Sequence, residues 1–220
     1  MPNDLENADR GFYQTAITTL QANDPKLAVI IDRVGGCTLN QHQHHGDVLD
    51  SLSRSIIFQQ LSTKSATAIY QRFLQLYSDQ QNLIAQDILN TSDETLRSVG
   101  LSRQKIVYLK DLAQTVLTGL PTLEELKQMD DETIVQTLTP IKGIGRWTVQ
   151  MLLIFRLHRP DVLPVDDLGV RSAIRRIYNL PDLPNKKMVE QIGQAWKPYR
   201  TIASWYLWRS LELPANIANC

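Results

Sequence analysis

Hydrophobic residues recur along most of the chain three and four positions apart, and no segment shows the alternation of a β-strand. This spacing is typical of amphipathic helices, so the sequence predicts an all-α protein of ten or more short helices. One of them is expected to begin at a capping box, Thr91 followed by Glu94, and to end at Gly100. The other predicted helices lie near residues 10–21 and 25–34 and at residues 47–59, 62–77, 102–117, 131–138, 146–157, 167–178, 186–195 and 200–211.

A turn with two glycines, Gly143 and Gly145, separates two of the predicted helices. Glycine adopts positive φ without strain and has no Cβ, so the backbone can turn sharply there and approach a ligand closely. Free amides at the start of the next helix favour an anion, and a phosphate fits them best. The sequence therefore predicts a phosphate-binding turn, with a plain helix end and loop as the alternative. The spaced positions of the pattern are Leu138, Ile141, Gly143, Ile144, Gly145 and Thr148.

Two adjacent carboxylates, Asp166 and Asp167, follow this turn, and Asp167 stands twenty residues after Trp147. Either aspartate can cap the helix that begins there, because a carboxylate accepts hydrogen bonds from the first free amides. A fixed carboxylate can also stabilise positive charge that develops on a sugar when its glycosidic bond breaks, and it can orient or deprotonate an attacking water. Capping alone and catalysis are both open at this point.

Charge is distributed unevenly although the 220-residue chain is neutral overall, with 23 basic and 23 acidic residues. Between residues 142 and 209 there are twelve Lys and Arg against five Asp and Glu. Overall neutrality argues against binding to DNA by bulk electrostatics alone. The local positive excess coincides with the glycine turn and the segment after it, where it indicates either a phosphate-binding side or an ordinary solvated surface.

Several protein classes are disfavoured by composition. No apolar run approaches the roughly 20 residues of a membrane span, and the acidic, polar start does not resemble a signal peptide. Cys37 and Cys220 form neither a disulfide framework nor a metal-ligand set, so an intracellular protein is expected. The histidines of the 41–45 run are interpreted as part of a polar linker rather than as metal ligands.

Five segments in order resemble the helix-hairpin-helix DNA glycosylase superfamily, in particular its alkyladenine branch, the 3-methyladenine DNA glycosylase II type. The resemblance implies a fold of two helical lobes with the active site in the cleft between them. It also implies one catalytic domain, residues 1–220, in which one lobe spans about 47–158, including the hairpin 138–149, and the other spans about 1–46 with 159–220. The matching segments are residues 52–64, 100–106, 138–149, 163–168 and 196–200.

The resemblance also implies roles for individual residues. Asp167 takes the catalytic position, and Asp166 is a helper or a helix cap. Trp147, Met151 and Trp208 form a pocket whose electron-rich faces attract a cationic base, with core packing as the alternative. Leu61 fills the gap left by an extruded nucleotide while Gln60 contacts the orphaned partner base, or Leu61 is a core residue. The phosphate-binding hairpin comprises Ile141, Gly143, Gly145 and Thr148, and its backbone at residues 141–146 holds a monovalent cation, Na⁺ or K⁺. Lys64, Arg103 and Lys105 are phosphate contacts or ordinary surface residues.

The subclass depends on Trp147. Relatives that also cleave the strand carry a lysine at this position, which forms a Schiff base with the sugar, and tryptophan cannot do so. The iron–sulfur cluster of the endonuclease III branch is not expected either, because the tail offers only Cys220. No other cofactor is implied.

The resulting prediction is a monomeric, monofunctional 3-methyladenine DNA glycosylase. It would bind double-stranded DNA, flip out an alkylated purine and hydrolyse its N-glycosidic bond to leave an abasic site. It would act away from membranes, in the nucleoid or cytoplasm of a bacterium or the nucleus of a eukaryote. The alternatives are a bifunctional glycosylase for oxidised or mispaired bases and a non-catalytic DNA-binding module.

Overall fold

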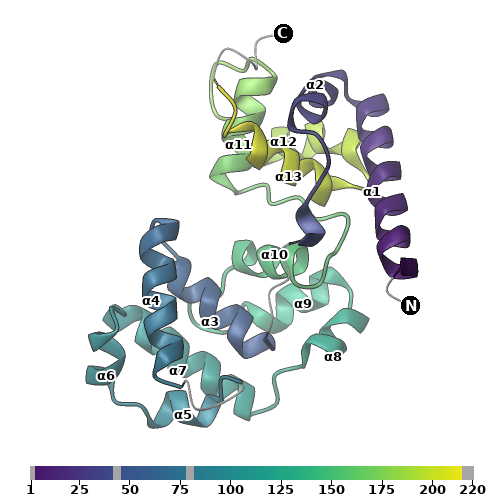
Figure 1. The fold of residues 1–220 in the computed structure, drawn as a ribbon. Coiled ribbons are helices and arrows are strands. Elements are labelled where there is room, and N and C mark those ends of the chain that lie inside the picture. The colour runs from purple at the N-terminus through teal and green to yellow at the C-terminus, as the bar shows by residue number, and fades with distance from the viewer. Residues whose placement is uncertain (1–2, 42–45, 78–81, 215–220) are drawn as a thin grey trace. The chain divides into compact units, whose positions relative to one another are not determined.

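The protein is all-helical, as predicted, in the residues that the computed structural model describes, which are 3–41, 46–77 and 82–214 (Figure 1). The chain forms two compact units. One is continuous, residues 43–157, and the other combines residues 1–42 with 158–220. These limits lie close to the lobe boundaries expected from the sequence. A cleft between the lobes stays a prediction.

The continuous unit is built around α7, which packs against α3, α5 and α6. The apolar side chains of α7 repeat at helical spacing, and Ile106, Leu109 and Leu112 are buried. Helix α3 also contacts α4 and α10, and α10 packs on α9. The helices are α3 (Val48–Phe58), α4 (Thr63–Gln75), α5 (Ala85–Asn90), α6 (Asp93–Ser98), α7 (Arg103–Leu117), α8 (Leu123–Gln128), α9 (Asp131–Leu138) and α10 (Arg146–Phe155).

The second unit is built around α13, which packs against α1, α2 and α11. Seven consecutive residues of α13, from Thr201 to Leu207, are buried, as expected for a helix surrounded by others. Its helices are α1 (Asn3–Asn23), α2 (Pro25–Val34), α11 (Leu168–Ile177), α12 (Lys186–Ile192) and α13 (Arg200–Ser210), with 3₁₀ turns at Leu39–Gln41 and Gly193–Trp196.

A buried carboxylate joins the two chain segments of this second unit. Asp24 caps α2 by accepting from the amides of Lys26 and Leu27, and it also accepts from the hydroxyl of Tyr178. The indole Nε1 of Trp196, which is fully buried, donates to Asp24 Oδ2 at 2.7 Å. A buried N–H without a partner is unfavourable, so this hydrogen bond favours the packing of the N-terminal helices against Trp196. Trp196 lies 172 residues after Asp24 in the sequence.

Two short helices, α5 and α8, were not predicted, and one predicted helix start was wrong. The capping box expected at Thr91 does not form. Ser92 is the cap of α6 and accepts from the amide of Thr95 at 3.1 Å. The hydroxyl of Thr91 donates instead to the carbonyl of Asp87 at 2.7 Å. No helix in the described part of the chain is long and apolar enough to cross a membrane.

Candidate functional site

The turn between α9 and α10 requires glycine at its first glycine position. Gly143 has φ of +82°, in the left-handed region that residues with a Cβ rarely adopt. A Cβ placed on Gly143 would lie 2.2 Å from Cδ2 of Tyr108. The backbone of the turn therefore lies against the aromatic ring, and α7 determines its conformation together with the glycine.

The start of α10 has no side-chain cap. Its N-cap is Gly145, which makes no side-chain cap hydrogen bond. In contrast, Asp130 caps α9 and Ser102 caps α7 through their side chains. Gly145, Arg146 and Trp147 are exposed. An exposed, uncapped helix N-terminus with partial positive charge is suited to an anion.

Two ion pairs brace this hairpin. Asp111 on α7 accepts from the backbone amide and from Nζ of Lys142, both at 2.9 Å. These hydrogen bonds hold the pKa of Asp111 below its usual value. Arg146 donates to both carboxylate oxygens of Glu132 at 2.9 and 2.7 Å and so joins the first turns of α9 and α10. The hairpin is thus fixed at its turn and across its two helices.

We expect the Asp111 contacts to stabilise the hairpin unit in a pH-dependent way. A carboxylate whose pKa is lower in the folded state than in the unfolded chain stabilises the fold above its unfolded pKa of about 3.9. That contribution is lost as the pH falls through the lower, folded value. Asp111→Ala should therefore reduce the free energy of unfolding at neutral pH by about 1 kcal/mol, a modest value because Lys142 is largely exposed. Urea unfolding of both proteins at a series of pH values measures the difference. A difference that does not shrink toward low pH would contradict the assignment.

The apolar positions of the hairpin pattern serve packing. Ile141 and Ile144 are each 3% exposed, and the amide of Ile144 donates to the carbonyl of Ile141 at 3.0 Å. Thr148, expected among the phosphate-binding residues, is also only 3% exposed. Its hydroxyl therefore does not lie on the surface that a phosphate would approach. The surface of the turn is formed by Gly145 and its exposed neighbours.

Asp167 is the N-cap of α11 and is also held by a tryptophan from α13. Its Oδ1 accepts from the amide of Val170 and from Nε1 of Trp208, both at 2.8 Å. The indole of Trp208 lies close against the backbone of Gly169, where an added Cβ would be 3.0 Å from its Cδ1. Gly169 allows the indole to approach, and the two hydrogen bonds fix the orientation of the Asp167 carboxylate. The helix-cap interpretation is correct for Asp167, and it is compatible with catalysis because the same bonds orient the group.

Asp166 has a different environment. Its Oδ2 pairs with Nζ of Lys186 at the start of α12, at 2.7 Å, and both side chains are well exposed. Asp166 is not the cap of α11, because that position belongs to Asp167. The two carboxylates are therefore distinct, one fixed by neutral N–H donors and the other paired with a cation.

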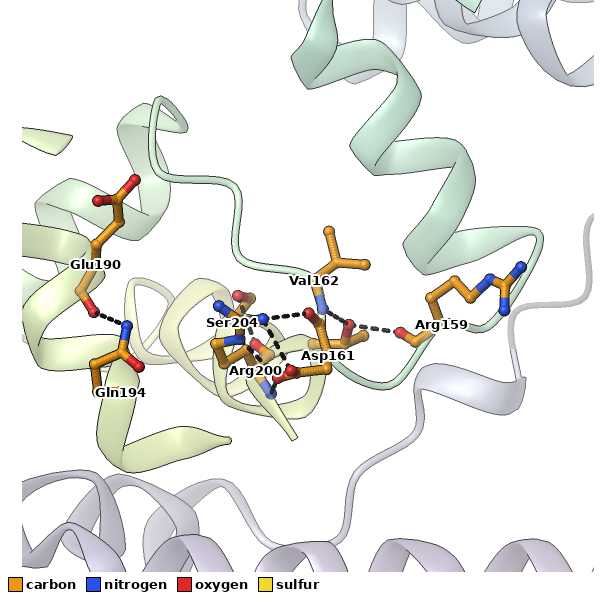
Figure 2. A network of polar contacts seen from close by, with 8 residues as sticks. Arg159, Asp161, Val162, Glu190, Gln194, Arg200 and Ser204 are labelled. Atoms are coloured by element: carbon orange, nitrogen blue, oxygen red, sulfur yellow. Dashed lines mark hydrogen bonds and ion pairs between the residues drawn. The ribbon is translucent and has the colours of Figure 1, made fainter. Parts of the chain in front are cut away.

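The connector that leads to Asp167 is anchored on α13. The guanidinium of Arg200 donates to Oδ1 and Oδ2 of Asp161 at 2.7 and 2.8 Å, and Figure 2 shows this pair beside Val162 and Arg159. The amide of Val162 donates to the hydroxyl of Thr201 at 2.9 Å. That hydroxyl donates to the carbonyl of Arg159 at 2.6 Å. Helix α13 therefore positions both the path of the chain toward Asp167 and the tryptophan that binds the carboxylate.

Trp208→Phe tests whether the indole N–H orients Asp167. Phenylalanine retains an aromatic ring but cannot donate the hydrogen bond. If Asp167 is catalytic, we expect the single-turnover rate of base release to fall by about ten-fold, the effect of one hydrogen bond to a charged group, while DNA affinity changes little. Gel shift and single-turnover kinetics separate the two quantities. An unchanged rate would show that the bond does not matter for the reaction.

A cavity of about 660 Å³ lies within the continuous unit. Met151 lines it together with Leu152 and Phe155 from the same face of α10, whereas Trp147 is not among its lining residues. The lining also includes Asp50, whose pKa is raised by burial and which accepts a hydrogen bond from the hydroxyl of Tyr70. Trp147 is 42% exposed near the start of α10. The structure thus places Met151 at a cavity and Trp147 at the surface beside the glycine turn.

The predicted wedge residue lies in the turn between α3 and α4. Leu61 is 40% exposed, which does not fit a core position. Gln60 before it is exposed and has φ of +57°. Lys64 and Arg103 are exposed as well, but Lys105 is not a surface cation available to a phosphate. Its Nζ donates to the carbonyls of Ile57 and Gln59 at 2.7 and 2.9 Å.

The candidate residues therefore fall into two groups. The continuous unit carries the hairpin, Trp147, Met151 and the Gln60–Leu61 turn, and the other unit carries Asp166, Asp167 and Trp208. Sequence reasoning did not identify Gln59, whose Nε2 donates to the carbonyl of Gly143 at 2.8 Å. It also missed Tyr108 and Asp111, since no local pattern marks residues that contact a turn more than thirty positions away.

Among the described residues, no group of three or more His, Cys, Asp and Glu side chains could hold a metal ion. The histidine run at 42–45 lies outside the described residues.

Comparison with known proteins places the chain in a family. The model of the HhH-GPD superfamily of base excision DNA repair proteins matches residues 53–198. The chain is 39% identical over 195 residues to DNA-3-methyladenine glycosylase 1 of Schizosaccharomyces pombe, which covers 88% of this chain and 86% of that protein.

Two solved structures are similar as well. The structure of Schizosaccharomyces pombe 3-methyladenine DNA glycosylase (Mag1) in complex with abasic DNA has a TM-score of 0.85 at 37% identity, covering 91% of this chain and 98% of that one. A DNA-3-methyladenine glycosidase of Bacillus halodurans has a TM-score of 0.77 at 36% identity, covering 89% and 88%. The resemblance seen in the sequence is confirmed, and this chain belongs to the HhH-GPD superfamily of base excision DNA repair proteins.

Proposed function

We propose that this protein is a monofunctional DNA-3-methyladenine glycosylase, which hydrolyses the N-glycosidic bond of alkylated purines in double-stranded DNA. Proteins named as 3-methyladenine DNA glycosylases or glycosidases are more than a third identical to this chain over most of its length. One of their structures is a complex with abasic DNA. The observation that carries the proposal is the carboxylate of Asp167, held by Val170 and Trp208. A monomer is expected, in the compartment that contains the DNA.

In the proposed reaction, water attacks C1′ of the flipped nucleotide and the bond from C1′ to the purine nitrogen breaks. The bonding electrons leave with the purine, which neutralises the positive charge of the alkylated base. Because C1′ gains positive character before water bonds to it, the fixed negative charge of Asp167 lowers the barrier. Asp167 also takes the proton of the water. The products are a free alkylated base and an abasic site.

Trp147 and Met151 of the continuous unit are proposed as contacts of the flipped base, and Trp208 of the other unit is proposed as a stacking residue. A cationic purine is attracted to the faces of aromatic rings by roughly 0.5–2 kcal/mol, and neutral purines gain less. The exposure of Trp147 leaves much of its indole accessible. The N–H of Trp208 already binds Asp167, so Trp208 would contact a base through its ring rather than through its nitrogen. Met151 would contribute a flexible, polarisable contact.

We propose that the protein has no lyase activity, because Trp147 stands at the position where strand-cleaving relatives are expected to carry a lysine. An indole has no amine and forms no Schiff base with the sugar. Lys142, the nearest lysine in the sequence, is paired with Asp111. The second carboxylate, Asp166, is paired with Lys186, and we assign it to the support of the connector rather than to the reaction.

The exposed amides at Gly145 and the start of α10 are proposed to hold a phosphate of the DNA backbone. Carbonyl oxygens of residues 141–146 would hold a Na⁺ or K⁺, which would supply positive charge near the phosphate. The carbonyls of Ile141 and Gly143 already accept hydrogen bonds from Ile144 and Gln59. A carbonyl oxygen has two lone pairs, so these contacts and a weakly bound cation are compatible. Leu61 would enter the duplex where the nucleotide leaves, with Gln60 beside the partner base.

The function is tested by incubating the purified protein with methylated duplex DNA in the presence of a chelator and separating the released bases by chromatography. We expect 3-methyladenine in the supernatant, intact strands until alkali is added, and no adduct after borohydride treatment. A trapped adduct or spontaneous nicking would favour the bifunctional alternative. DNA binding without any released base would favour a non-catalytic binding module.

A further inference from the structure

The turn that carries the proposed wedge has an uncommon backbone conformation. Gln60 has φ of +57°, in the left-handed region that is disfavoured for any residue with a Cβ. The residue is exposed, so its own side chain is not packed in a way that would impose this conformation. Such backbone geometry persists only where surrounding contacts determine it. The contacts on either side of Gln60 therefore need an explanation.

The first contact fixes the end of α3. Nζ of Lys105 on α7 donates to the carbonyls of Ile57 and Gln59 at 2.7 and 2.9 Å. The last carbonyls of a helix lack partners within it and carry partial negative charge, so an ammonium group is favoured there. Lys105 is half-buried and its pKa is lowered by desolvation. It thus binds the backbone immediately before Gln60 and Leu61.

The second contact joins this turn to the hairpin. Nε2 of Gln59 donates to the carbonyl of Gly143 at 2.8 Å, across 84 positions in the sequence. Gly143 is itself held by its positive φ and by the ring of Tyr108. The side chain of Gln59 therefore connects the residue before Gln60 to the most constrained point of the hairpin. Both ends of this connection lie within the continuous unit.

We infer that Gln59 is a positioning residue that sets the place of Leu61 relative to the phosphate-binding hairpin, while Lys105 fixes the same turn from α7. The inference rests on the proposed roles of Leu61 and the hairpin. In the proposed complex the hairpin binds a phosphate of the duplex and Leu61 enters the base stack. The distance between the hairpin and Leu61 must therefore match the DNA. One side chain that joins them makes this distance a property of the folded protein.

The test uses duplex DNA that contains a tetrahydrofuran abasic analogue with 2-aminopurine as the neighbouring base. The analogue cannot be cleaved, and the fluorescence of 2-aminopurine rises when a wedge disrupts its stacking. Gln59→Met retains the length of the side chain and removes the donor. We expect the equilibrium constant between inserted and uninserted complexes to fall about three- to ten-fold, the scale of one net hydrogen bond. Leu61→Ala should abolish most of the fluorescence rise.

The decisive comparison is the double variant. Because Leu61→Ala removes most of the fluorescence signal, this comparison measures affinity for the duplex with the abasic analogue. If Gln59 acts through Leu61, Gln59→Met should lower that affinity in the wild-type background and cause no further loss in the Leu61→Ala background. Gln86→Met is the matched control, because Gln86 is exposed in the same unit and donates only to Asn90, four residues away. Gln59→Glu, which stays polar but cannot donate, repeats the test if the methionine variant unfolds at a lower temperature than the wild type.

Each result can be assigned to one idea. Wild-type fluorescence with Gln59→Met, or equal losses in the presence and absence of Leu61, would overturn the positioning role while leaving the wedge intact. Wild-type fluorescence with Leu61→Ala would overturn the wedge, and the positioning role with it, without touching the base-release assay that tests the enzymatic function.

Discussion

Asp167→Asn should retain the fold and DNA binding but lose base release by on the order of 10³-fold. Asparagine is as good a helix cap as aspartate, and its carbonyl oxygen can accept the same hydrogen bonds from Val170 and Trp208. What the substitution removes is the negative charge that would face C1′. The substitution therefore separates the observed cap role of Asp167 from its proposed catalytic role.

The measurement is the single-turnover release of 3-methyladenine from methylated DNA, together with the melting temperature and the affinity for DNA with an abasic site. Asp166→Asn is the matched control. It removes the same charge one position earlier and breaks an exposed ion pair with Lys186, which typically contributes less than about 1 kcal/mol. We expect its rate to stay within a few-fold of wild type. Comparable rates for the two variants would contradict the role given to Asp167.

Gly143→Ala should disrupt the hairpin, whereas Gly145→Ala should leave it intact. At position 143 the new Cβ meets the ring of Tyr108 at 2.2 Å and the backbone has φ of +82°. The overpacking and the left-handed conformation together are expected to destabilise this unit by about 2–4 kcal/mol. At position 145 a Cβ meets no protein atom within 4 Å, and φ is −95°.

DNA binding and stability should therefore separate between the two glycines. Gly143→Ala loses both, and Tyr108→Ala should restore part of the affinity by removing the clash. Gly145→Ala retains the melting temperature but loses affinity, roughly ten-fold or more, if a phosphate approaches the backbone at Gly145. Fluorescence anisotropy with duplex DNA and thermal unfolding provide the two readouts. Unchanged DNA affinity in Gly145→Ala would show that the phosphate does not bind at this turn.

Local patterns predicted most of the helices but not all of their boundaries. Helix α5 has Ile84 as its N-cap with no side-chain hydrogen bond, so the sequence has no capping residue to mark its start. Helix α8 begins at a capping box between Thr122 and Glu125, a signal that was present and overlooked beside Pro121. At α6 two overlapping candidates were available, and the hydroxyl of Thr91 was taken by Asp87, so Ser92 became the cap.

The site was predictable to the extent that its residues follow a short spacing. The glycine turn and the aspartate pair stand out in the sequence, and the structure brings a tryptophan onto Asp167 from 41 positions away. That contact, and the contact of Gln59 with Gly143, depend on how helices pack, which spacing does not reveal. Lys105 was interpreted as a phosphate contact or an ordinary surface residue. Its ammonium group instead donates to the carbonyls of Ile57 and Gln59 at the end of α3, which no local pattern predicts.

The order of segments along the chain has a consequence for biosynthesis. Residues 43–157 form one uninterrupted unit, whereas the unit with Asp167 combines chain segments that precede and follow this stretch. The whole continuous unit is therefore synthesised before Trp196 can donate to Asp24 and before Trp208 can donate to Asp167. During translation α1 and α2 can pack only on each other until the 3₁₀ turn at Gly193–Trp196 and α13 have been synthesised. The hairpin can therefore form before Trp208, which binds the carboxylate of Asp167, has been synthesised.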